Sequence, residues 1–141
     1  MNGHELVRDV MHEGVITCRP DTPVTDVIET MNQHDVSALV VVDREGYAVG
    51  VISRTDLVNA GFVAPYLHHF RGMTAEHLMS SPVIAVAPDT PVTDAVALIR
   101  EKRIHRLVVV RPEDPDHLRP VGILSMTDLV RELSDLEPGE R

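Results

Sequence analysis

The stretch Pro20-Asp21-Thr22-Pro23-Val24-Thr25-Asp26-Val27 recurs almost unchanged as Pro88-Asp89-Thr90-Pro91-Val92-Thr93-Asp94-Ala95. The first seven residues of the two copies are identical, and the copies lie 68 positions apart. Such identity at a fixed offset indicates an internal repeat, which sets the frame for every other pattern in the chain. The sequence therefore predicts two similar units in tandem: a first repeat over residues 5–61, a linker over 62–73, a second repeat over 74–135 and a frayed tail over 136–141.

The composition is typical of a globular protein. The 141 residues, of which 43% are hydrophobic and 25% charged, suffice for one domain or for two very small ones that share a core. No apolar run approaches the roughly 20 residues that span a bilayer, and the first residues lack the pattern of a secretion signal. The single cysteine, Cys18, excludes an internal disulfide. We therefore expect a cytoplasmic protein that has no membrane partner.

The charge and the aromatic content limit the possible ligands. A net charge of −9 disfavours non-specific binding to nucleic acid, which needs a basic face. The chain has two phenylalanines, two tyrosines and no tryptophan, so no platform for base stacking stands out. A small anionic ligand is still compatible with this composition, because a few local cations and backbone N–H groups can hold it.

Hydrophobic periodicity predicts the same order of elements in both repeats. In the first repeat we expect a helix over residues 6–11, a short strand over 15–18, a helix capped by Thr22 with Pro23 as its first residue, strands over 38–42 and 48–52, and a helix from 53 to about 61. In the second repeat the matching segments are 75–79, 83–86, a helix capped by Thr90, strands over 107–110 and 121–124, and a helix from 125.

These elements predict an α/β (α+β) fold of two pseudo-symmetric repeats, each a small three-stranded sheet with flanking helices. Three short strands bury little surface alone, so we expect the two sheets to pack face to face as one module. The second repeat is longer between its last two strands, and the proline-rich, acidic residues 111–117 predict an exposed loop there.

The junction between the last strand and the last helix carries the same motif twice, Ser53-Arg54-Thr55-Asp56 and Ser125-Met126-Thr127-Asp128, each preceded by Gly-x-x. One interpretation is a capping box, in which serine and aspartate satisfy the first turn of the helix reciprocally. The other is a nucleotide site, because a helix N-terminus attracts phosphate and an aspartate there can accept hydrogen bonds from both ribose hydroxyls. The motif alone leaves both open.

A second candidate group, His105-Arg106, lies at the start of the buried strand of the second repeat. Lys102 and Arg103 before it suit a solvated helix end, whereas a histidine and an arginine at the strand start can pair with phosphate oxygens. The first repeat has Ser37-Ala38 at the matching place and no cation. The two halves of the chain are therefore not equivalent.

No catalytic set emerges from the sequence, and we expect a protein that is not an enzyme. The adjacent histidines His68 and His69 point to different faces of a regular element, which is a poor geometry for chelation, so a metal site there is disfavoured. Cys18 is interpreted as a small buried apolar residue beside its strand.

The chain resembles a pair of CBS (cystathionine beta-synthase) domains, together called a Bateman module, over about residues 5–135. The resemblance rests on three motifs that occur in the same order in both repeats. They are the Pro-Asp-Thr-Pro helix start, the segment Val36-Ser37-Ala38-Leu39 or its counterpart Ile104-His105-Arg106-Leu107, and the Gly-x-x-Ser-x-x-Asp ending. Several of these motifs are also similar to repeats of the gamma subunit of AMP-activated protein kinase. Val108 and Val40 replace a proline that is common in the family, which removes a marker but no ligand group.

The resemblance implies a stand-alone regulatory module that senses AMP, ADP or ATP in two clefts, needs no obligatory cofactor, forms a homodimer and acts on a partner protein in trans. The first cleft would combine Ser53, Arg54, Thr55 and Asp56 with Ile84, His105 and Arg106, with Asp56 on the ribose, Ser53, His105 and Arg106 on the phosphates, and Ile84 beside the adenine. The second, weaker cleft would combine Ile16, Val36 and Ser37 with Ser125, Thr127 and Asp128. The alternatives are a ligand-free dimerising scaffold and a module for S-adenosylmethionine or a dinucleotide.

Overall fold

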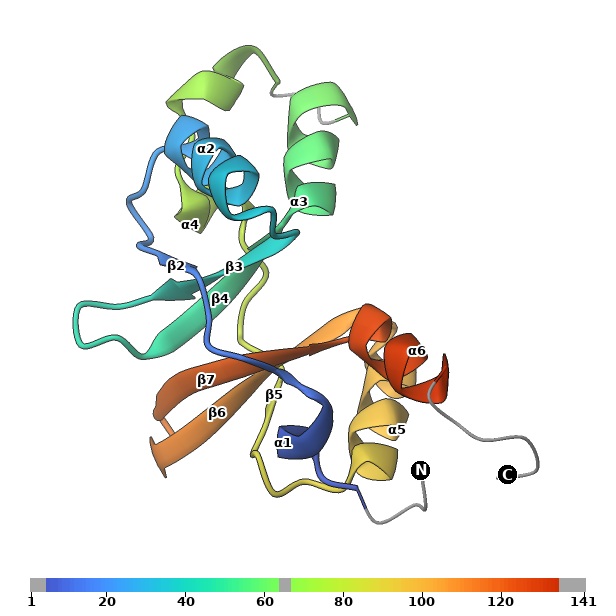
Figure 1. Cartoon of the computed structure of the whole chain (residues 1–141). Helices are drawn as coiled ribbons and strands as arrows, with labels where there is room; N and C mark the ends of the chain where they lie inside the picture. The colour runs from blue at the N-terminus through green and yellow to red at the C-terminus, as the bar shows by residue number, and fades with distance from the viewer. Residues whose placement is uncertain (1–4, 64–66, 135–141) are drawn as a thin grey trace. The chain divides into compact units, whose positions relative to one another are not determined.

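The computed structural model describes residues 5–63 and 67–134 of the chain (Figure 1). They form two compact units that are not simply the two halves of the sequence. The central unit comprises residues 15–63 and 67–83, and the terminal unit comprises residues 5–14 together with 84–134. Each unit has its own sheet and its own buried core.

The central unit contains a three-stranded sheet, as the sequence predicts, and its strand order is β2-β3-β4. β2 runs parallel to β3, and β3 pairs with β4 in antiparallel orientation. The strands are β2 (Thr17–Cys18), β3 (Ala38–Val42) and β4 (Ala48–Ser53). The helices are α2 (Val24–His34), α3 (Arg54–Val58), α4 (Ala75–Leu78), the π-helical turn η1 (Asn59–Val63) and the 3-10 helix η2 (Leu67–Gly72).

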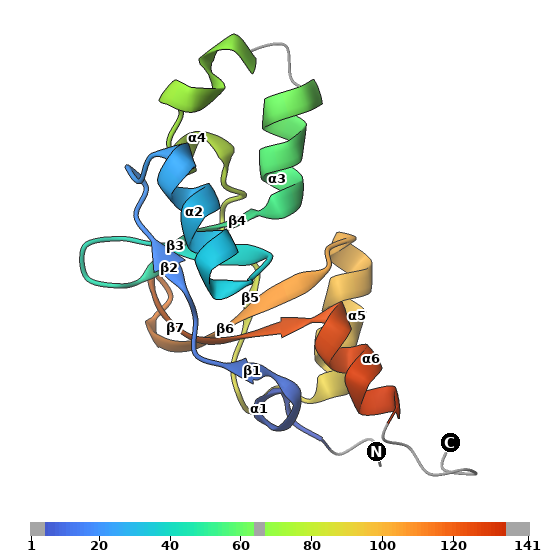
Figure 2. The ribbon, with the colours of Figure 1, turned by 45° about the horizontal axis from the view of Figure 1, so that its top comes forward.

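The terminal unit contains a four-stranded sheet in the order β1-β7-β6-β5 (Figure 2). Its strands are β1 (His12–Glu13), β5 (Ala85–Val86), β6 (Arg106–Asp114) and β7 (His117–Ser125), and its helices are α1 (Val7–Val10), α5 (Val92–Lys102) and α6 (Met126–Ser134). Three of the strands repeat the arrangement of the central sheet. The fourth, β1, pairs with the edge of β7 and was not predicted, because a two-residue strand with exposed side chains has no apolar pattern.

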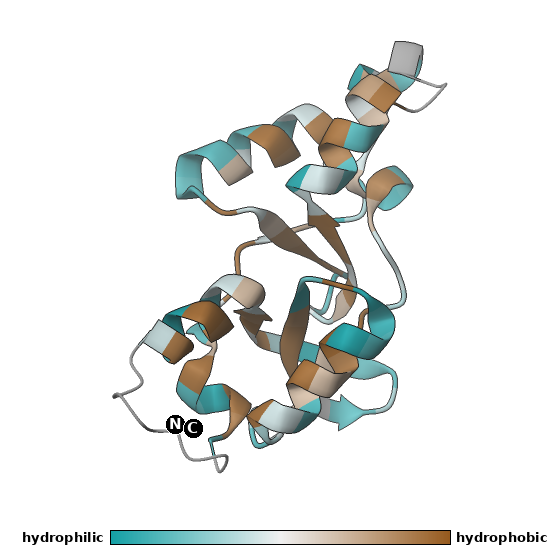
Figure 3. Cartoon of the chain, turned by 90° about the vertical axis from the view of Figure 1, so that its right-hand side faces the viewer, coloured by the Kyte–Doolittle hydropathy of each residue, from teal (hydrophilic) through white to brown (hydrophobic). Residues whose placement is uncertain are grey.

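The apolar face of α2 packs on the central sheet, and that of α5 packs on the terminal sheet. In the central unit Val24, Val27 and Met31 of α2 pack with Leu39 and Ile52 of the sheet, all of them almost fully buried. The corresponding cluster of the terminal unit contains Val7, Val92, Ala95, Ile99, Leu107, Val109, Leu124 and Leu129. In Figure 3 the central strands are mainly hydrophobic, whereas the helices carry hydrophobic and hydrophilic residues side by side. This is the pattern expected of amphipathic helices on a buried sheet.

The repeated Pro-Asp-Thr-Pro stretches hold the short opening helix of the other repeat. In the central unit the Ala75 N–H donates to the Thr22 carbonyl and the Glu76 N–H donates to the Pro20 carbonyl, both at 2.9 Å. In the terminal unit the Val7 N–H donates to the Thr90 carbonyl at 2.8 Å. Each opening helix therefore belongs to the compact unit of the other sequence repeat, which explains why this stretch is the most similar part of the two copies.

The predicted caps of the two long helices were wrong by one residue. The N-cap residues of α2 and α5 are Pro23 and Pro91, and neither helix has a side-chain cap. The Thr22 hydroxyl instead accepts a hydrogen bond from the Arg19 N–H at 2.9 Å, which stabilises the turn before the helix. A threonine before Pro serves either role, and only the backbone conformation decides between them.

Residues 111 and 113–117 are exposed, as predicted, but the predicted loop conformation over residues 111–117 was wrong. β6 continues to Asp114 and β7 begins at His117, so the inserted residues lengthen a hairpin rather than form a loop. The tip of the hairpin is fixed by side chains, since the Asp114 carboxylate pairs with His117 Nδ1 at 2.5 Å and accepts from the Asp116 N–H at 2.8 Å. The hydrogen bond with the His117 side chain, and after it the one from the Asp116 N–H, lowers the pKa of Asp114.

The predicted linker is partly helical. Residues 62–63 end η1 and residues 67–72 form η2, whose Phe70 packs against the central core. Residues 64–66 and the predicted tail over 136–141 lie outside the described residues. Within the described parts of the chain, no three His, Cys, Asp or Glu side chains are grouped as metal ligands, and no helix has the length and apolarity to cross a membrane. Cys18 is buried in the central core, as predicted.

Candidate functional site: two helix starts and the strands beside them

The helix start of the central unit is a complete capping box. Ser53 Oγ accepts a hydrogen bond from the Asp56 N–H at 3.2 Å. Asp56 Oδ2 accepts from the Ser53 N–H at 2.8 Å and from the Ser53 hydroxyl at 3.0 Å. The box engages one carboxylate oxygen only, because Asp56 Oδ1 has no hydrogen-bond partner among the described residues. The structural interpretation of the motif is therefore correct, and it leaves an acceptor for a ligand.

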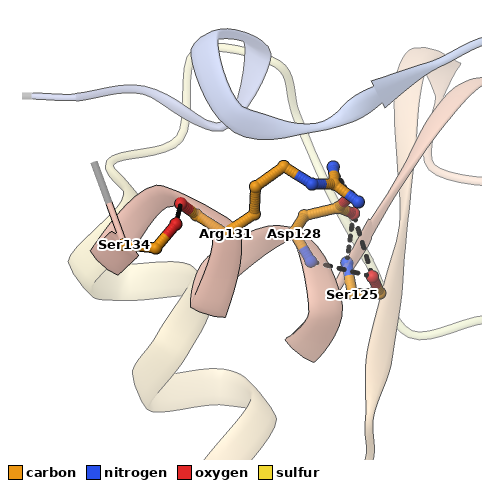
Figure 4. A network of polar contacts seen from close by, with 4 residues as sticks. All are labelled: Ser125, Asp128, Arg131 and Ser134. Atoms are coloured by element: carbon orange, nitrogen blue, oxygen red, sulfur yellow. Dashed lines mark hydrogen bonds and ion pairs between the residues drawn. The ribbon is translucent and has the colours of Figure 1, made fainter.

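The helix start of the terminal unit has the same box and one additional contact (Figure 4). Asp128 Oδ2 accepts from the Ser125 N–H at 2.9 Å and from the Ser125 hydroxyl at 3.0 Å. Its other oxygen, Oδ1, lies 3.4 Å from Arg131 Nη1 and accepts a hydrogen bond from it. Both oxygens of this carboxylate are thus engaged, and the side chain is only 9% exposed.

The strand start of the terminal unit lies directly beside its helix start. Arg106 pairs with Ser125 across the antiparallel β6 and β7, and the Met126 N–H donates to the His105 carbonyl at 3.0 Å. His105 is exposed and Arg106 is partly buried. Ile84 immediately precedes β5 and packs at the edge of the terminal core. His105 and Arg106 thus lie beside the Ser125 helix start of the same unit, whereas Ile84 lies before β5, on the other side of β6 from β7.

The central unit repeats this arrangement without the cations. Ala38 pairs with Ser53 across β3 and β4, and the Arg54 N–H donates to the Ser37 carbonyl at 2.9 Å. Ser37 is exposed, and Ile16 and Val36 pack at the edge of the central core. The predicted difference between Ser37-Ala38 and His105-Arg106 therefore occurs at equivalent positions of two equivalent sheets.

Arg54 supplies a cation at the central helix start. Its guanidinium lies 3.8 Å from Asp35 Oδ1, and the two side chains are 50% and 99% exposed. An ion pair this open to solvent contributes at most about 1 kcal/mol. Arg54 is therefore held loosely, and a ligand anion can replace Asp35 as its partner at little cost.

Each predicted cleft takes its residues from both units. For the first cleft, Ser53, Arg54, Thr55 and Asp56 lie in the central unit, and Ile84, His105 and Arg106 lie in the terminal unit. For the second cleft, Ile16, Val36 and Ser37 lie in the central unit, and Ser125, Thr127 and Asp128 lie in the terminal unit. The structure places each half, and the joining of the halves into clefts stays a prediction.

Sequence reasoning missed Arg131, which contacts one of the predicted ligand groups. The signal was present, because an Asp and an Arg three positions apart on a helix are neighbours on its surface. Arg131 lies outside the Ser-x-x-Asp motif that the two repeats share. One turn further, the first repeat has Asn59 where the second has Arg131.

Known proteins are similar to this chain over nearly its whole length. A family model described as the CBS domain matches residues 7–62 and again residues 75–135. An uncharacterized protein of Methanopyrus kandleri is 30% identical over 125 residues, which cover 89% of this chain. The match spans 61% of that relative, so the chain corresponds to less than two thirds of the relative's length.

Two solved structures with bound ligands have the same fold. The CBSX2 structure, a complex with AMP, is 29% identical with a TM-score of 0.75, over 92% of this chain and 96% of that one. The CBS domain pair of protein MJ0100, a complex with 5'-methylthioadenosine and S-adenosyl-L-methionine, is 26% identical with a TM-score of 0.79, over 92% and 96% of the two chains. The predicted α/β fold of two repeats is confirmed by these likenesses.

Proposed function

Because the chain belongs to the CBS domain family and carries two of its repeats, we propose that it is a regulatory module that binds adenosine-containing nucleotides and signals to a partner protein in trans. The proposed ligands are AMP, ADP and ATP. The AMP complex of CBSX2 supports this class of ligand, and the MJ0100 complex makes S-adenosylmethionine the first alternative. The proposed role is binding rather than catalysis, with no obligatory cofactor.

The observation that carries this proposal is the open carboxylate oxygen of Asp56 beside a helix N-terminus. Asp56 Oδ1 is without a partner among the described residues, so it can accept a hydrogen bond from a ribose hydroxyl. The first turn of α3 and the loosely held Arg54 favour an anion nearby. Ser53 is proposed to share the phosphates with His105 and Arg106 of the terminal unit, and Ile84 to flank the adenine.

The proposal predicts that an adenosine ligand stabilises the folded chain. Ligand at 100 times its dissociation constant adds ~2.7 kcal/mol to the free energy of unfolding. For a protein of this size each kcal/mol raises the melting temperature by roughly 2–4 °C. Thermal unfolding is measured with AMP, ADP, ATP, adenosine and S-adenosylmethionine. Unchanged curves with all five ligands would contradict the proposal.

A pair of variants tests the assignment of the two clefts. Replacing both His105 and Arg106 by alanine removes charge-assisted hydrogen bonds worth roughly 1.5–3 kcal/mol each, so AMP affinity at the first cleft should fall strongly. Asp128→Ala should leave that affinity nearly unchanged, because Asp128 is assigned to the second cleft. If Asp128→Ala abolished AMP binding and the double variant did not, the two clefts would have been assigned in reverse.

We also propose a homodimer, for which exposed apolar side chains on the helices give support. Met126, Val130 and Leu133 are 45%, 59% and 52% exposed, and they form one stripe along α6. Val58 and Phe62, at the end of α3 and in η1, are 53% and 81% exposed. They border an apolar groove of about 400 Å³ in the central unit. A second copy of the chain could cover such faces. Sedimentation of the wild type and of Val130→Glu tests this, and a monomeric wild type would contradict it.

The second candidate function is a ligand-free dimerising scaffold. It is favoured by the completeness of both capping boxes, which need no ligand to satisfy the helix starts. The absorbance spectrum of the purified protein separates the two candidates, because a bound adenine contributes near 260 nm in a chain without tryptophan. A protein that carries no nucleotide and gains no stability from any adenosine ligand would be the scaffold.

A further inference from the structure

The two helix starts differ in whether a cation contacts the aspartate carboxylate. Asp128 Oδ1 accepts a hydrogen bond from Arg131 Nη1 at 3.4 Å, as Figure 4 shows. At the equivalent place, one turn past Asp56, the central unit has the neutral and exposed Asn59. In the described residues no cation lies on the Asp56 carboxylate.

The covered oxygen is the one that a ligand would need. In both boxes Oδ2 accepts two hydrogen bonds from the serine of the same box. Oδ1 is then the acceptor left for the hydroxyls of a ribose. In Asp56 this oxygen is open, whereas in Asp128 it carries the guanidinium of Arg131. The Asp128 side chain is also 9% exposed, and a ligand hydroxyl reaches Oδ1 in place of the Arg131 guanidinium only if that guanidinium moves.

We propose that Arg131 closes the Ser125 helix start to ribose hydroxyls, so that a ligand enters the second cleft only by displacing its guanidinium. This inference rests on the proposed function and adds a cause for the inequality of the two clefts that does not depend on His105 and Arg106. Arg131 is a specificity-determining residue that acts through Asp128.

The strength of the closure follows from the exposure of the pair. The Arg131 side chain is 68% exposed, so the pair resembles surface ion pairs rather than buried ones. Displacing it should weaken ligand binding by about two- to fivefold. Arg131 therefore reduces occupancy of the second cleft without abolishing it, and salt should weaken the closure by screening the pair.

The chain supplies its own matched variants for a test. Arg131→Asn gives the second helix start the residue of the first, and Asn59→Arg makes the reverse exchange. Adenosine is the probe, because an uncharged ligand has no direct attraction to either cation. Equilibrium dialysis is performed in an Asp56→Ala background to isolate the second cleft and in an Asp128→Ala background to isolate the first. Thermal unfolding without ligand confirms that each variant is folded.

We expect Arg131→Asn to raise the adenosine affinity of the second cleft two- to fivefold, and Asn59→Arg to lower that of the first by a similar factor. Raising the sodium chloride concentration should strengthen adenosine binding to the second cleft only while Arg131 is present. Arg131→Lys keeps the charge and should stay close to the wild type.

Two outcomes separate this inference from the proposed function. If the wild type binds adenosine and neither exchange changes either affinity, or Arg131→Asn weakens binding, the inference is wrong and the proposed function stands. If neither the wild type nor any variant binds adenosine, AMP, ADP, ATP or S-adenosylmethionine, both are wrong.

Discussion

The two compact units hold a short helix in the same way, with equivalent residues that lie 68 positions apart in the sequence. Thr22 and Pro20 accept backbone hydrogen bonds from α4 in the central unit, and Thr90 and Pro88 accept them from α1 in the terminal unit. The units differ where the repeats diverge in sequence: in the added strand β1, in the longer β6–β7 hairpin and in Arg131. Shared residues therefore maintain the fold. Of the three differences, Arg131 contacts a predicted ligand group, whereas the hairpin tip lies at the opposite end of β6 and β7 from Arg106 and Ser125.

The largest expected effect comes from the equivalent core positions Ile52 and Leu124. Both side chains are fully buried at the end of the returning strand of their sheet. Truncating either to alanine should lower the free energy of unfolding by about 2–5 kcal/mol, because the cavity left behind adds to the lost burial. Chemical denaturation measures the loss, and hydrogen exchange in β3 and β6 shows which unit opens. A loss below about 1 kcal/mol at one position would show that the two cores are not equally well packed.

The next largest effect on stability distinguishes Gly122 and Gly50. Gly122 faces the residues that follow α1, and Gly50 faces those that follow α4. A Cβ added to Gly122 would lie 2.6 Å from the His12 carbonyl oxygen, a backbone atom that cannot move freely. A Cβ added to Gly50 would lie 2.5 Å from Met79 Sδ, which belongs to a flexible side chain. Gly122→Ala should therefore cost about 1–3 kcal/mol and Gly50→Ala less. Equal or reversed losses in chemical denaturation would contradict this explanation.

A smaller effect compares the two aspartates of the capping boxes. Replacing Asp56 by alanine should lower stability by about 0.5–2 kcal/mol, the usual cost of losing a helix cap. Asp128→Ala should cost more than Asp56→Ala, because it also removes the partner of Arg131 and leaves a gap at a side chain that is 9% exposed. Thermal unfolding without ligand measures both. A larger loss for Asp56→Ala would show that Arg131 contributes nothing to the second box.

The smallest effect concerns Cys18, whose equivalent in the second repeat is Val86. Burial raises the pKa of the Cys18 thiol from 9.0 to about 11. The unfolded chain ionises first as the pH rises, so the contribution of Cys18 to stability is complete below about pH 9 and is lost toward pH 11. Cys18→Val should be nearly neutral at pH 7 and should reduce this alkaline loss. Thermal unfolding between pH 7 and 11 gives the comparison, and identical profiles would contradict it.

Much of the local structure could be predicted from the sequence. The strands β3 and β4 follow from apolar runs, and the helix α2 follows from helical periodicity. All three elements occur within a few residues of the predicted limits. The Ser-x-x-Asp motifs form capping boxes because all their atoms lie within one helical turn. Interactions between residues only a few positions apart require particular residue types at a fixed spacing, so they can be predicted from the sequence.

The contacts that were missed have weaker patterns. Thr22 was interpreted as a cap because threonine before proline favours a helix start, but its hydroxyl accepts from Arg19 instead. The extension of β6 to Asp114 was obscured by two prolines and several acidic residues, which usually mark loops. Arg131 lies one turn beyond the motif, where the sequence comparison had stopped.

The sequence by itself determined that the chain contains two repeats, most of the helices and strands that each repeat forms, and that His105 and Arg106 have no counterpart in the first repeat. Only the tertiary structure decided that α1 packs with the second sheet and α4 with the first. It also decided that Asp56 keeps one open carboxylate oxygen, whereas both oxygens of Asp128 are engaged. The reason is physical. Helices α1 and α4 are each held by backbone hydrogen bonds to residues far away in the sequence. Almost any residue type can make a backbone hydrogen bond, so such contacts leave no pattern in the sequence.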